Sequence, residues 1–243
     1  MPLPNLLIAG AQKSATTWLH QALRKSAQFQ ASKPKELNFF LDPDYAAKID
    51  SYAAHFPARD GVRHAYESSP EYFRLPGDRG DVAARIAEVL PDAEILVILR
   101  NPVDRYLSAY THHMMKSRYP YAPEIDVMES SRNMLAFGLY GAILAHWRKV
   151  LPQVRVYFFD DFVADKSAFF STILGDLGVA RDVADADLDF AVNAKARKFK
   201  KNDWPEMPRL SDGLRAKLHA YYQDDIALLE EQTGRNLSGW KAA

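Results

Sequence analysis

The chain contains no cysteine, and this absence excludes disulfide bonds, thiolate metal ligands and a cysteine nucleophile. It also lacks an excess of either charge, because 31 lysine and arginine residues balance 31 aspartate and glutamate residues. A general nucleic-acid binder needs a basic surplus to contact phosphates, so we expect no nucleic-acid partner. The apolar run near the N-terminus, residues 6–9, falls far short of a membrane span. We therefore expect a soluble, cytoplasmic protein.

The apolar residues that are present are sufficient for a large folded core. The 243 residues are 48% hydrophobic and 12% aromatic, which is too apolar for a disordered chain. At roughly 150 residues per domain, this length allows one large domain or two small ones. Short apolar runs alternate with longer helical patterns, which is typical of βαβ units. We predict a single α/β domain over residues 1–243, with a central, mostly parallel sheet flanked by helices.

Three apolar runs are predicted to form buried strands of this sheet. They cover residues 6–9, 95–99 and 154–159. A helix is expected after each strand: Asn101 and Pro102 suit the cap and first position of the second helix, and Asp165 can cap the third. A last long helix is expected over residues 211–231.

Two further regions are poorly periodic and rich in Pro, Tyr and Ser. They cover residues 26–80 and 116–138. We predict long loops with short helices there. Loops of this length in a compact domain are usually functional.

The loop after the first predicted strand is a candidate phosphate cradle. It reads Gly10-Ala11-Gln12-Lys13-Ser14-Ala15-Thr16-Thr17. Backbone N–H groups at such a turn point toward the ligand, and the dipole of the following helix favours an anion. Lys13 adds a cation, and the hydroxyl groups add hydrogen-bond donors. An ordinary polar turn with Thr as the helix cap explains the same residues equally well.

A nucleoside-triphosphate P-loop is the nearest alternative for this segment. That loop needs four residues between its glycines, followed by Gly-Lys-Ser/Thr. Here Lys13 follows Gly10 by only three positions, and position 15 is alanine instead of glycine. The spacing therefore disfavours a nucleoside-triphosphate P-loop. The pair Asp160 and Asp161, after the third predicted strand, would suit the magnesium ion of such an enzyme.

A second strand end carries residues suited to another anion site. Arg100 directly follows the second strand, at the carboxyl edge where open α/β sheets bind ligands. Ser108 would lie about two turns after Pro102, roughly 9 Å along the helix. Together they could hold a separate phosphate. In the alternative, Arg100 pairs with Asp104 and Ser108 is merely tolerated in the helix.

These two elements together resemble the sulfotransferases that use 3′-phosphoadenosine 5′-phosphosulfate (PAPS). In that family a Lys-Ser/Gly-x-Thr-Thr loop holds the 5′-phosphosulfate, and an Arg-(Asn/Asp)-Pro-x-x-Arg-x-x-Ser-x-Tyr element holds the 3′-phosphate. Residues 13–17 and 100–110 match these patterns in the same order. The resemblance extends along most of the chain and is closest to the heparan-sulfate 3-O- and N-sulfotransferase type. It implies a P-loop-like fold, PAPS as co-substrate and PAP as product.

Two more segments resemble that group, with informative departures. Residues 33–40 look like its Lys-Glu-x-x-Phe-Phe segment, and residues 67–73 look like its Glu-Lys-Thr-Pro-x-Tyr-Phe segment. Asn38 stands where the group has His, and Ser68 stands where it has Lys. These two positions contact the sulfated polysaccharide in that group, so the acceptor here is expected to differ from heparan. We take Asn38, Ser68 and Trp147 as candidate residues for an unidentified small-molecule, lipid or carbohydrate acceptor.

The resemblance implies a role for each candidate residue. Lys13 is expected to bond the oxygen that bridges sulfur and phosphorus, and Glu36 to act as the base that deprotonates the acceptor hydroxyl or amine. The donor nucleotide is expected to contact Lys13, Ser14, Ala15, Thr16, Thr17, Trp18, Arg100 and Ser108. His112 and His113 are rival bases, because histidine titrates near neutrality. No metal ion is expected.

A basic run of five cations over residues 195–201 has two interpretations. As a flap over the nucleotide, it would place Phe199 against adenine and Lys200 and Lys201 on the 3′-phosphate. In related enzymes a basic C-terminal segment covers the nucleotide in this way. As a solvated surface run, it would balance the aspartates of residues 182–189.

Two other classes of function also fit the nucleotide loop. A nucleotide-dependent kinase would bind ATP–Mg²⁺ more tightly than PAP. A non-catalytic nucleotide-binding module would bind PAP yet tolerate the loss of Glu36.

Overall fold

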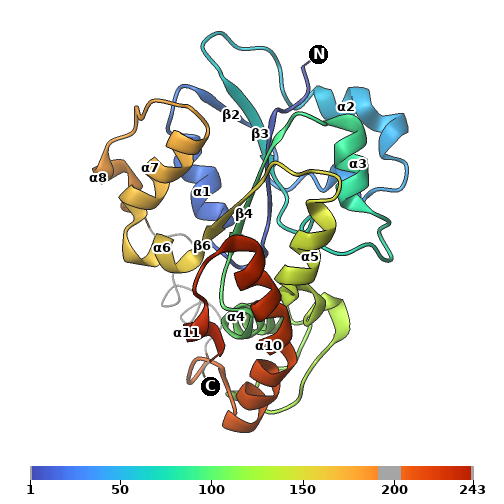
Figure 1. The fold of residues 1–243 in the computed structure, drawn as a ribbon, viewed down its shortest axis with the longest axis vertical. Helices are drawn as coiled ribbons and strands as arrows, with labels where there is room; N and C mark the ends of the chain where they lie inside the picture. Colours follow the sequence, from blue (N-terminus) through green and yellow to red (C-terminus); the bar gives the residue numbers. More distant parts are fainter. Residues whose placement is uncertain (1, 191–203, 242–243) are drawn as a thin grey trace. The chain divides into compact units, whose positions relative to one another are not determined.

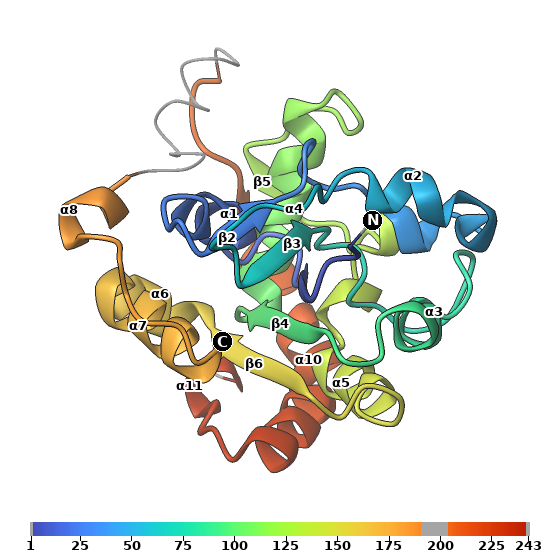
Figure 2. The ribbon, with the colours of Figure 1, turned by 90° about the horizontal axis from the view of Figure 1, so that it is seen from above.

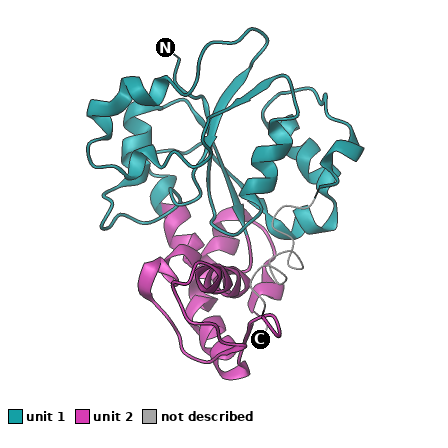
Figure 3. Cartoon of the chain, turned by 180° about the vertical axis from the view of Figure 1, so that it is seen from behind, with its two compact units in different colours: residues 1–99, 146–190 teal, residues 100–145, 191–243 magenta. Residues whose placement is uncertain are grey.

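The chain forms two compact units in the computed structural model, which describes residues 2–190 and 204–241 (Figure 3). The first unit holds residues 1–99 and 146–190, and the second holds residues 100–145 and 191–243. A single domain over residues 1–243 therefore stays a prediction.

A five-stranded parallel sheet forms the centre of the first unit (Figure 1). Its strands, in spatial order, are β2 (Phe29–Ala31), β3 (His64–Ser68), β1 (Leu6–Gly10), β4 (Glu94–Leu99) and β6 (Val154–Phe158). Every neighbouring pair is parallel, so all five carboxyl ends lie along one edge of the sheet. The predicted mostly parallel central sheet is confirmed.

Helices cover both faces of this sheet (Figures 1 and 2). One face carries α1 (Thr16–Leu23), α6 (Phe159–Ala164) and α7 (Lys166–Asp176), and the other carries α2 (Ile49–Ala53) and α3 (Val82–Val89). The short α8 (Asp185–Leu188) follows α7. Because both faces are covered, β1 is buried along its whole length and β4 along all but its first residue, which explains their apolar sequences.

Capping residues set the ends of several helices, and those at Asn101 and Asp165 are as predicted. Asn101 accepts a hydrogen bond from the first turn of α4 (Pro102–Met115) at 2.9 Å. Asp165 accepts two from the first turn of α7, at 2.8 and 2.9 Å. Ser211 caps α10 (Asp212–Thr233), which ends at a glycine in the left-handed conformation.

The two regions predicted to be loops with short helices do contain short helices, but they also contain strands, and in this respect the prediction was wrong. Residues 26–80 hold β2 and β3, and residues 116–138 hold β5 (Glu124–Ile125), which pairs with β7 (Arg209–Leu210). β2 is three residues long, and β3 places polar side chains on both faces, so neither shows an apolar alternation. The strand predicted over residues 154–159 is also one residue shorter, because Phe159 begins α6 directly.

The second unit is built around α4 and α10. Arg105 of α4 is fully buried and donates to the Met134 carbonyl, while the Tyr222 hydroxyl of α10 donates to the Leu135 carbonyl at 3.0 Å. The Asp225 carboxylate accepts two backbone N–H groups at the start of α5, both at 2.8 Å. The remaining elements are η1 (Phe39–Leu41), η2 (Tyr45–Lys48), η3 (Ser131–Asn133), η4 (Ala136–Gly138), α5 (Tyr140–Trp147) and α11 (Ser238–Lys241).

Candidate functional site

The loop between β1 and α1 has backbone angles that are uncommon for residues other than glycine. Lys13 has a φ of 72° and Ala15 has a φ of 62°, both in the left-handed region although neither is glycine. This conformation costs roughly 1–2 kcal/mol per residue. Strained residues of this kind gather at ligand clamps, and left-handed residues in a turn direct successive N–H groups to one side. The backbone therefore has the form of an anion-binding loop.

The first turn of α1 is also available to an anion. The residue at the cap position is Ala15, and within the described part of the chain no side chain caps this helix. The alternative in which a threonine caps the helix is therefore not found, because Thr16 and Thr17 lie inside the first turn. The first N–H groups of a helix have no partner within the helix, and the helix dipole adds a partial positive charge there.

Two buried hydroxyl groups lie near this loop. Ser14 and Ser68 are both 0% exposed, and neither Oγ atom has a hydrogen-bond partner among the described residues. Ser68 pairs with Ile8 in the sheet register and faces the same side as Tyr66, whose hydroxyl donates to the His20 carbonyl of α1 at 2.6 Å. Ser68 therefore lies on the α1 face of the sheet, nearer the carboxyl edge than Tyr66. An unpaired buried hydroxyl costs about 1–3 kcal/mol, so both atoms point to a bound polar group.

Gly10 allows the segment after β3 to close over β1. The Phe73 N–H donates to the Ala9 carbonyl at 2.9 Å, and a Cβ atom at Gly10 would lie 2.4 Å from the Phe73 Cβ. Trp147 packs on the Phe73 ring and donates from Nε1 to the Arg74 carbonyl at 3.0 Å. Trp147 is fully buried, so its predicted contact with an acceptor would require this packing to open.

Trp18, predicted to lie near adenosine, is enclosed by aromatic rings. It is 3% exposed, and its Nε1 donates to the Leu188 carbonyl at 3.4 Å. The surrounding rings are those of Phe162, Phe169, Phe170 and Phe190. Only the rim of the indole could meet a nucleotide, and its contact with adenosine stays a prediction.

The candidate base lies on a turn that follows the carboxyl end of β2. Glu36 has a φ of 64° and Asn38 a φ of 53°, so this turn also contains two left-handed residues that are not glycine. The Glu36 side chain is 50% exposed and forms an ion pair with Lys35. An exposed carboxylate on a strained turn has the accessibility that a base for an external acceptor needs.

Next to this turn, a buried carboxylate collects three hydroxyl donors. Glu67 is fully buried and accepts hydrogen bonds from the hydroxyls of Tyr52 at 2.7 Å, Ser69 at 2.8 Å and Tyr72 at 2.9 Å. Burial raises the pKa of Glu67, and the three hydrogen bonds oppose that shift. We assigned Glu67 no role from the sequence, although it lies in the segment 67–73 that resembles the sulfotransferases. The only sequence signal was its place in that segment.

The second predicted anion site lies at the start of α4. Arg100 directly follows β4, and its Nη2 lies 3.8 Å from the Asp104 carboxylate. The alternative pairing is therefore present, at a distance typical of weak surface pairs worth about 0–1 kcal/mol. Ser108 is half-buried on the same helix. Their predicted contacts with a 3′-phosphate stay predictions.

The remaining predicted residues divide into two groups. His113 is 6% exposed and has Arg118 at 3.3 Å from its Nδ1, while His112 is half-buried. Phe199, Lys200 and Lys201, the candidate flap residues, lie outside the described residues.

Within residues 2–190 and 204–241, no group of three His, Asp or Glu side chains is arranged to hold a metal ion. The same ranges contain no helix with the length and apolar character needed to cross a membrane.

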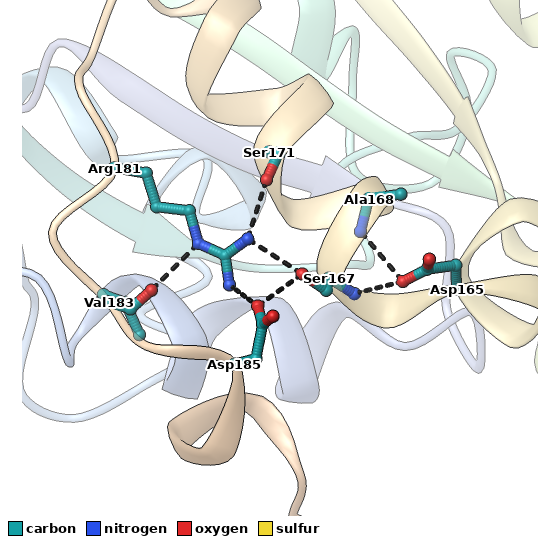
Figure 4. Close-up of polar contacts among 7 residues, drawn as sticks. All are labelled: Asp165, Ser167, Ala168, Ser171, Arg181, Val183 and Asp185. Carbon is teal, nitrogen blue, oxygen red and sulfur yellow. Dashed lines mark hydrogen bonds and ion pairs between the residues drawn. The ribbon is translucent and has the colours of Figure 1, made fainter.

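A separate polar network links α7 to α8 (Figure 4). The Arg181 guanidinium donates to Ser167 and Ser171 at 2.8 and 2.9 Å, donates to the Val183 carbonyl at 2.9 Å, and pairs with Asp185. Ser167 Oγ also donates to Asp185, at 2.5 Å. Because the positive charge of Arg181 is balanced by Asp185, this network is structural and does not offer an anion site.

The parallel sheet and the strained loop at its carboxyl edge define an α/β protein with a P-loop-like fold. The family model described as the Sulfotransferase family matches residues 57–183. The chain belongs to the sulfotransferase family.

Individual relatives agree with this assignment. The human bifunctional heparan sulfate N-deacetylase/N-sulfotransferase 2 is 37% identical over 178 residues, which cover 65% of this chain and 20% of that protein. The human heparan sulfate glucosamine 3-O-sulfotransferase 6 is 24% identical over 262 residues, which cover 98% of this chain and 73% of that protein. The crystal structure of a sulfotransferase from Alicyclobacillus acidocaldarius matches with a TM-score of 0.77 and 27% identity, over 100% of both chains. The chain thus spans one fifth of the first relative and most of the second.

Proposed function

We propose that this protein transfers a sulfuryl group from PAPS to a hydroxyl or amine group of an acceptor. The observation that carries this proposal is the β1–α1 loop of a member of the sulfotransferase family, because it combines left-handed residues with a helix start that no side chain of the described residues caps. The buried hydroxyls of Ser14 and Ser68, which have no partner within residues 2–190 and 204–241, support the same proposal, since a bound polar group would satisfy them.

In this proposal the β1–α1 loop binds the phosphosulfate end of PAPS. The loop amides and the hydroxyls of Ser14, Thr16 and Thr17 hold the 5′-phosphate. Lys13 bonds the oxygen that bridges sulfur and phosphorus, where negative charge grows as the S–O bond breaks. That contact strengthens in the transition state, so it raises kcat as well as affinity.

Further contacts with the donor are proposed for Ser68, Arg100 and Ser108. The position of Ser68 on the α1 face favours a contact with the phosphosulfate over a contact with the acceptor. Arg100 and Ser108 are proposed for the 3′-phosphate, on the strength of the resemblance. Their contacts change little as sulfur moves, so they contribute to affinity and orientation.

Glu36 is the proposed base on the acceptor side. Its carboxylate takes the proton from the acceptor hydroxyl or amine while the acceptor oxygen or nitrogen forms a bond to sulfur. The bond between sulfur and the bridging oxygen breaks, and its electron pair leaves with PAP. As in phosphoryl transfer, the protein mainly aligns the two reactants and stabilises charge.

The acceptor is proposed to be less anionic than heparan sulfate. Asn38 lies next to the proposed base, and its Nδ2 donates to the Glu36 carbonyl at 3.3 Å. Asn38 does not supply the positive charge that a sulfated polysaccharide would require. A hydroxyl or amine on a small molecule, a lipid or a neutral sugar fits this position.

Transfer of ³⁵S-labelled sulfate from PAPS to a panel of acceptors tests the proposal. The panel contains phenols, aliphatic alcohols, amines, lipids and neutral glycans. Labelled product with at least one class is the expected result. Transfer of ³²P from ATP, with no sulfate transfer, would support the kinase alternative instead. PAP binding without any transfer would support a non-catalytic module.

A further inference from the structure

The turn that carries Glu36 is held by two hydroxyl groups from the segment after β3. The Asn38 N–H donates to Ser69 Oγ at 3.0 Å, and the Phe40 N–H donates to the Tyr72 hydroxyl at 3.3 Å. Each of these hydroxyls also donates its own hydrogen to Glu67. Two chains of hydrogen bonds therefore lead from one buried carboxylate to the backbone on the C-terminal side of Glu36.

The direction of these hydrogen bonds depends on Glu67. A hydroxyl has a single hydrogen, so when Ser69 and Tyr72 donate to Glu67, their lone pairs remain for the backbone N–H groups of the turn. An ionised carboxylate only accepts hydrogen bonds, which fixes both hydroxyls in this sense. The buried position of Glu67 strengthens each bond, because the surroundings have a low dielectric constant.

The turn needs this support because its backbone is strained. Glu36 and Asn38 each adopt the left-handed conformation, which for residues other than glycine costs about 1–3 kcal/mol and persists only where contacts enforce it. The hydrogen bond from the Asn38 N–H acts directly on one of the two strained residues. If it is lost, the turn can relax and carry the Glu36 carboxylate with it.

We propose that Glu67, Ser69 and Tyr72 form a positioning relay that sets the direction of the Glu36 carboxylate toward the acceptor. None of the three needs to touch a substrate, so they are positioning residues. The inference rests on the proposed role of Glu36 as base. A displacement of about 1 Å in a reacting group can lower the rate by roughly 100-fold, so a relay of this kind matters for turnover.

Tyr52 provides a matched control for this relay. Its hydroxyl donates to Glu67 as the Tyr72 hydroxyl does, but Tyr52 contacts the turn through its ring, which stacks on Phe39 at 4.1 Å. Tyr52→Phe removes one donor from Glu67 and keeps the ring. Ser69→Ala removes one donor from Glu67 and also the acceptor of the Asn38 N–H.

The test compares Ser69→Ala, Ser69→Thr, Tyr52→Phe and Glu36→Gln in the full chain. For each variant, kcat and the KM for PAPS are measured with the acceptor found in the transfer panel, together with Tm and the Kd for PAP. We expect Ser69→Ala to lower kcat by about 10- to 100-fold without a change in the KM for PAPS or the Kd for PAP. Ser69→Thr keeps the hydroxyl and restores kcat, and Tyr52→Phe lowers Tm with little change in kcat.

The outcomes separate the relay from the proposed function. If Glu36→Gln abolishes turnover while Ser69→Ala leaves kcat unchanged, the relay is wrong and the proposed base stands. If Ser69→Ala and Tyr52→Phe lower kcat equally, or if Ser69→Ala also weakens PAP binding, the cluster only supports packing and the relay is wrong. If Glu36→Gln leaves kcat unchanged, both the base and the relay are wrong. Failure of the unmodified protein to transfer sulfate from PAPS to any acceptor would overturn the proposed function itself.

Discussion

The two strained loops of the first unit are held in shape by different means. In the β1–α1 loop, backbone contacts hold both ends: the Ala11 N–H donates to the Ile98 carbonyl of β4 at 2.9 Å, the Leu19 N–H donates to the Ala15 carbonyl, and the following helix supplies the dipole. The turn around Glu36 is held by side chains 31 and 32 residues away in the sequence, through Asn38 and Phe40. Backbone contacts with a neighbouring strand and with the following helix therefore hold the proposed nucleotide loop, whereas hydroxyl side chains hold the turn of the proposed base.

This difference predicts how each loop responds to substitution. Changes within the β1–α1 loop should alter both nucleotide affinity and turnover. Changes around Glu36 should alter turnover alone, including changes at residues that lie far from it in the sequence.

The largest effect is expected for Glu36→Gln. The neutral amide cannot accept the acceptor proton, so kcat should fall by about 10²- to 10⁴-fold while the Kd for PAP stays the same. Steady-state transfer assays and calorimetric titration with PAP measure the two quantities. Glu94→Gln is the matched control, because Glu94 lies at the start of β4, at the edge of the sheet opposite the carboxyl ends, where it accepts a hydrogen bond from Arg155 at 2.8 Å. Equal activity of the two variants would contradict the role of Glu36.

Lys13→Ala should have the next largest effect. Without the ammonium group, the charge on the departing bridging oxygen is unbalanced, and kcat should fall by about 10²- to 10³-fold. PAP binding should weaken as well, unlike in Glu36→Gln, because Lys13 belongs to the proposed nucleotide loop. Lys25→Ala removes a surface lysine that lies 3.8 Å from Asp187, and it should leave both quantities unchanged. Normal turnover in Lys13→Ala would remove the proposed leaving-group contact.

Gly10→Ala tests the close approach between β1 and the segment after β3. The added Cβ would lie 2.4 Å from the Phe73 Cβ, so the two segments must separate, at a cost of roughly 1–3 kcal/mol in the free energy of unfolding. Chemical denaturation measures this cost. Gly213→Ala is the matched control, because its Cβ would meet nothing within 4 Å and the helix gains about 0.5–1 kcal/mol. A Gly10→Ala variant as stable as the original chain would show that the approach is not tight.

Asp165→Ala should have the smallest effect of the four. Loss of the cap of α7 should lower the free energy of unfolding by about 1 kcal/mol. This cap lies beside the Arg181 network (Figure 4), and its two hydrogen bonds run to Ser167 and Ala168 of α7 itself, so kcat and PAP affinity should not change. A fall in kcat without a fall in stability would mean that the α7 region takes part in turnover.

Much of the fold could be predicted from the sequence because its signals are local. The apolar strands β1, β4 and β6 and the caps Asn101, Asp165 and Ser211 each depend on residues close together in the chain. β2 and β3 could not be predicted, because they are short or polar and exist through pairing with β1 and with each other.

Some features of the candidate site could likewise be predicted from the sequence, and others could not. The β1–α1 loop could be predicted from its spacing, since its residue pattern and the helix that follows it are close together in the sequence. The burial of Glu67, Trp18 and Trp147 could not, because each is enclosed by residues distant in the sequence. The role of Ser68 also depends on the sheet register, which decides which face its hydroxyl lies on.

A thermal-shift comparison of PAP with ATP–Mg²⁺ tests the central claim, a binding site for PAPS, most directly. A ligand at about 100 times its Kd stabilises the folded state by ~2.7 kcal/mol, which is readily measured as a rise in Tm. The account predicts a rise with PAP that is lost in Lys13→Ala, and a smaller rise or none with ATP–Mg²⁺. A larger rise with ATP–Mg²⁺ than with PAP would contradict it.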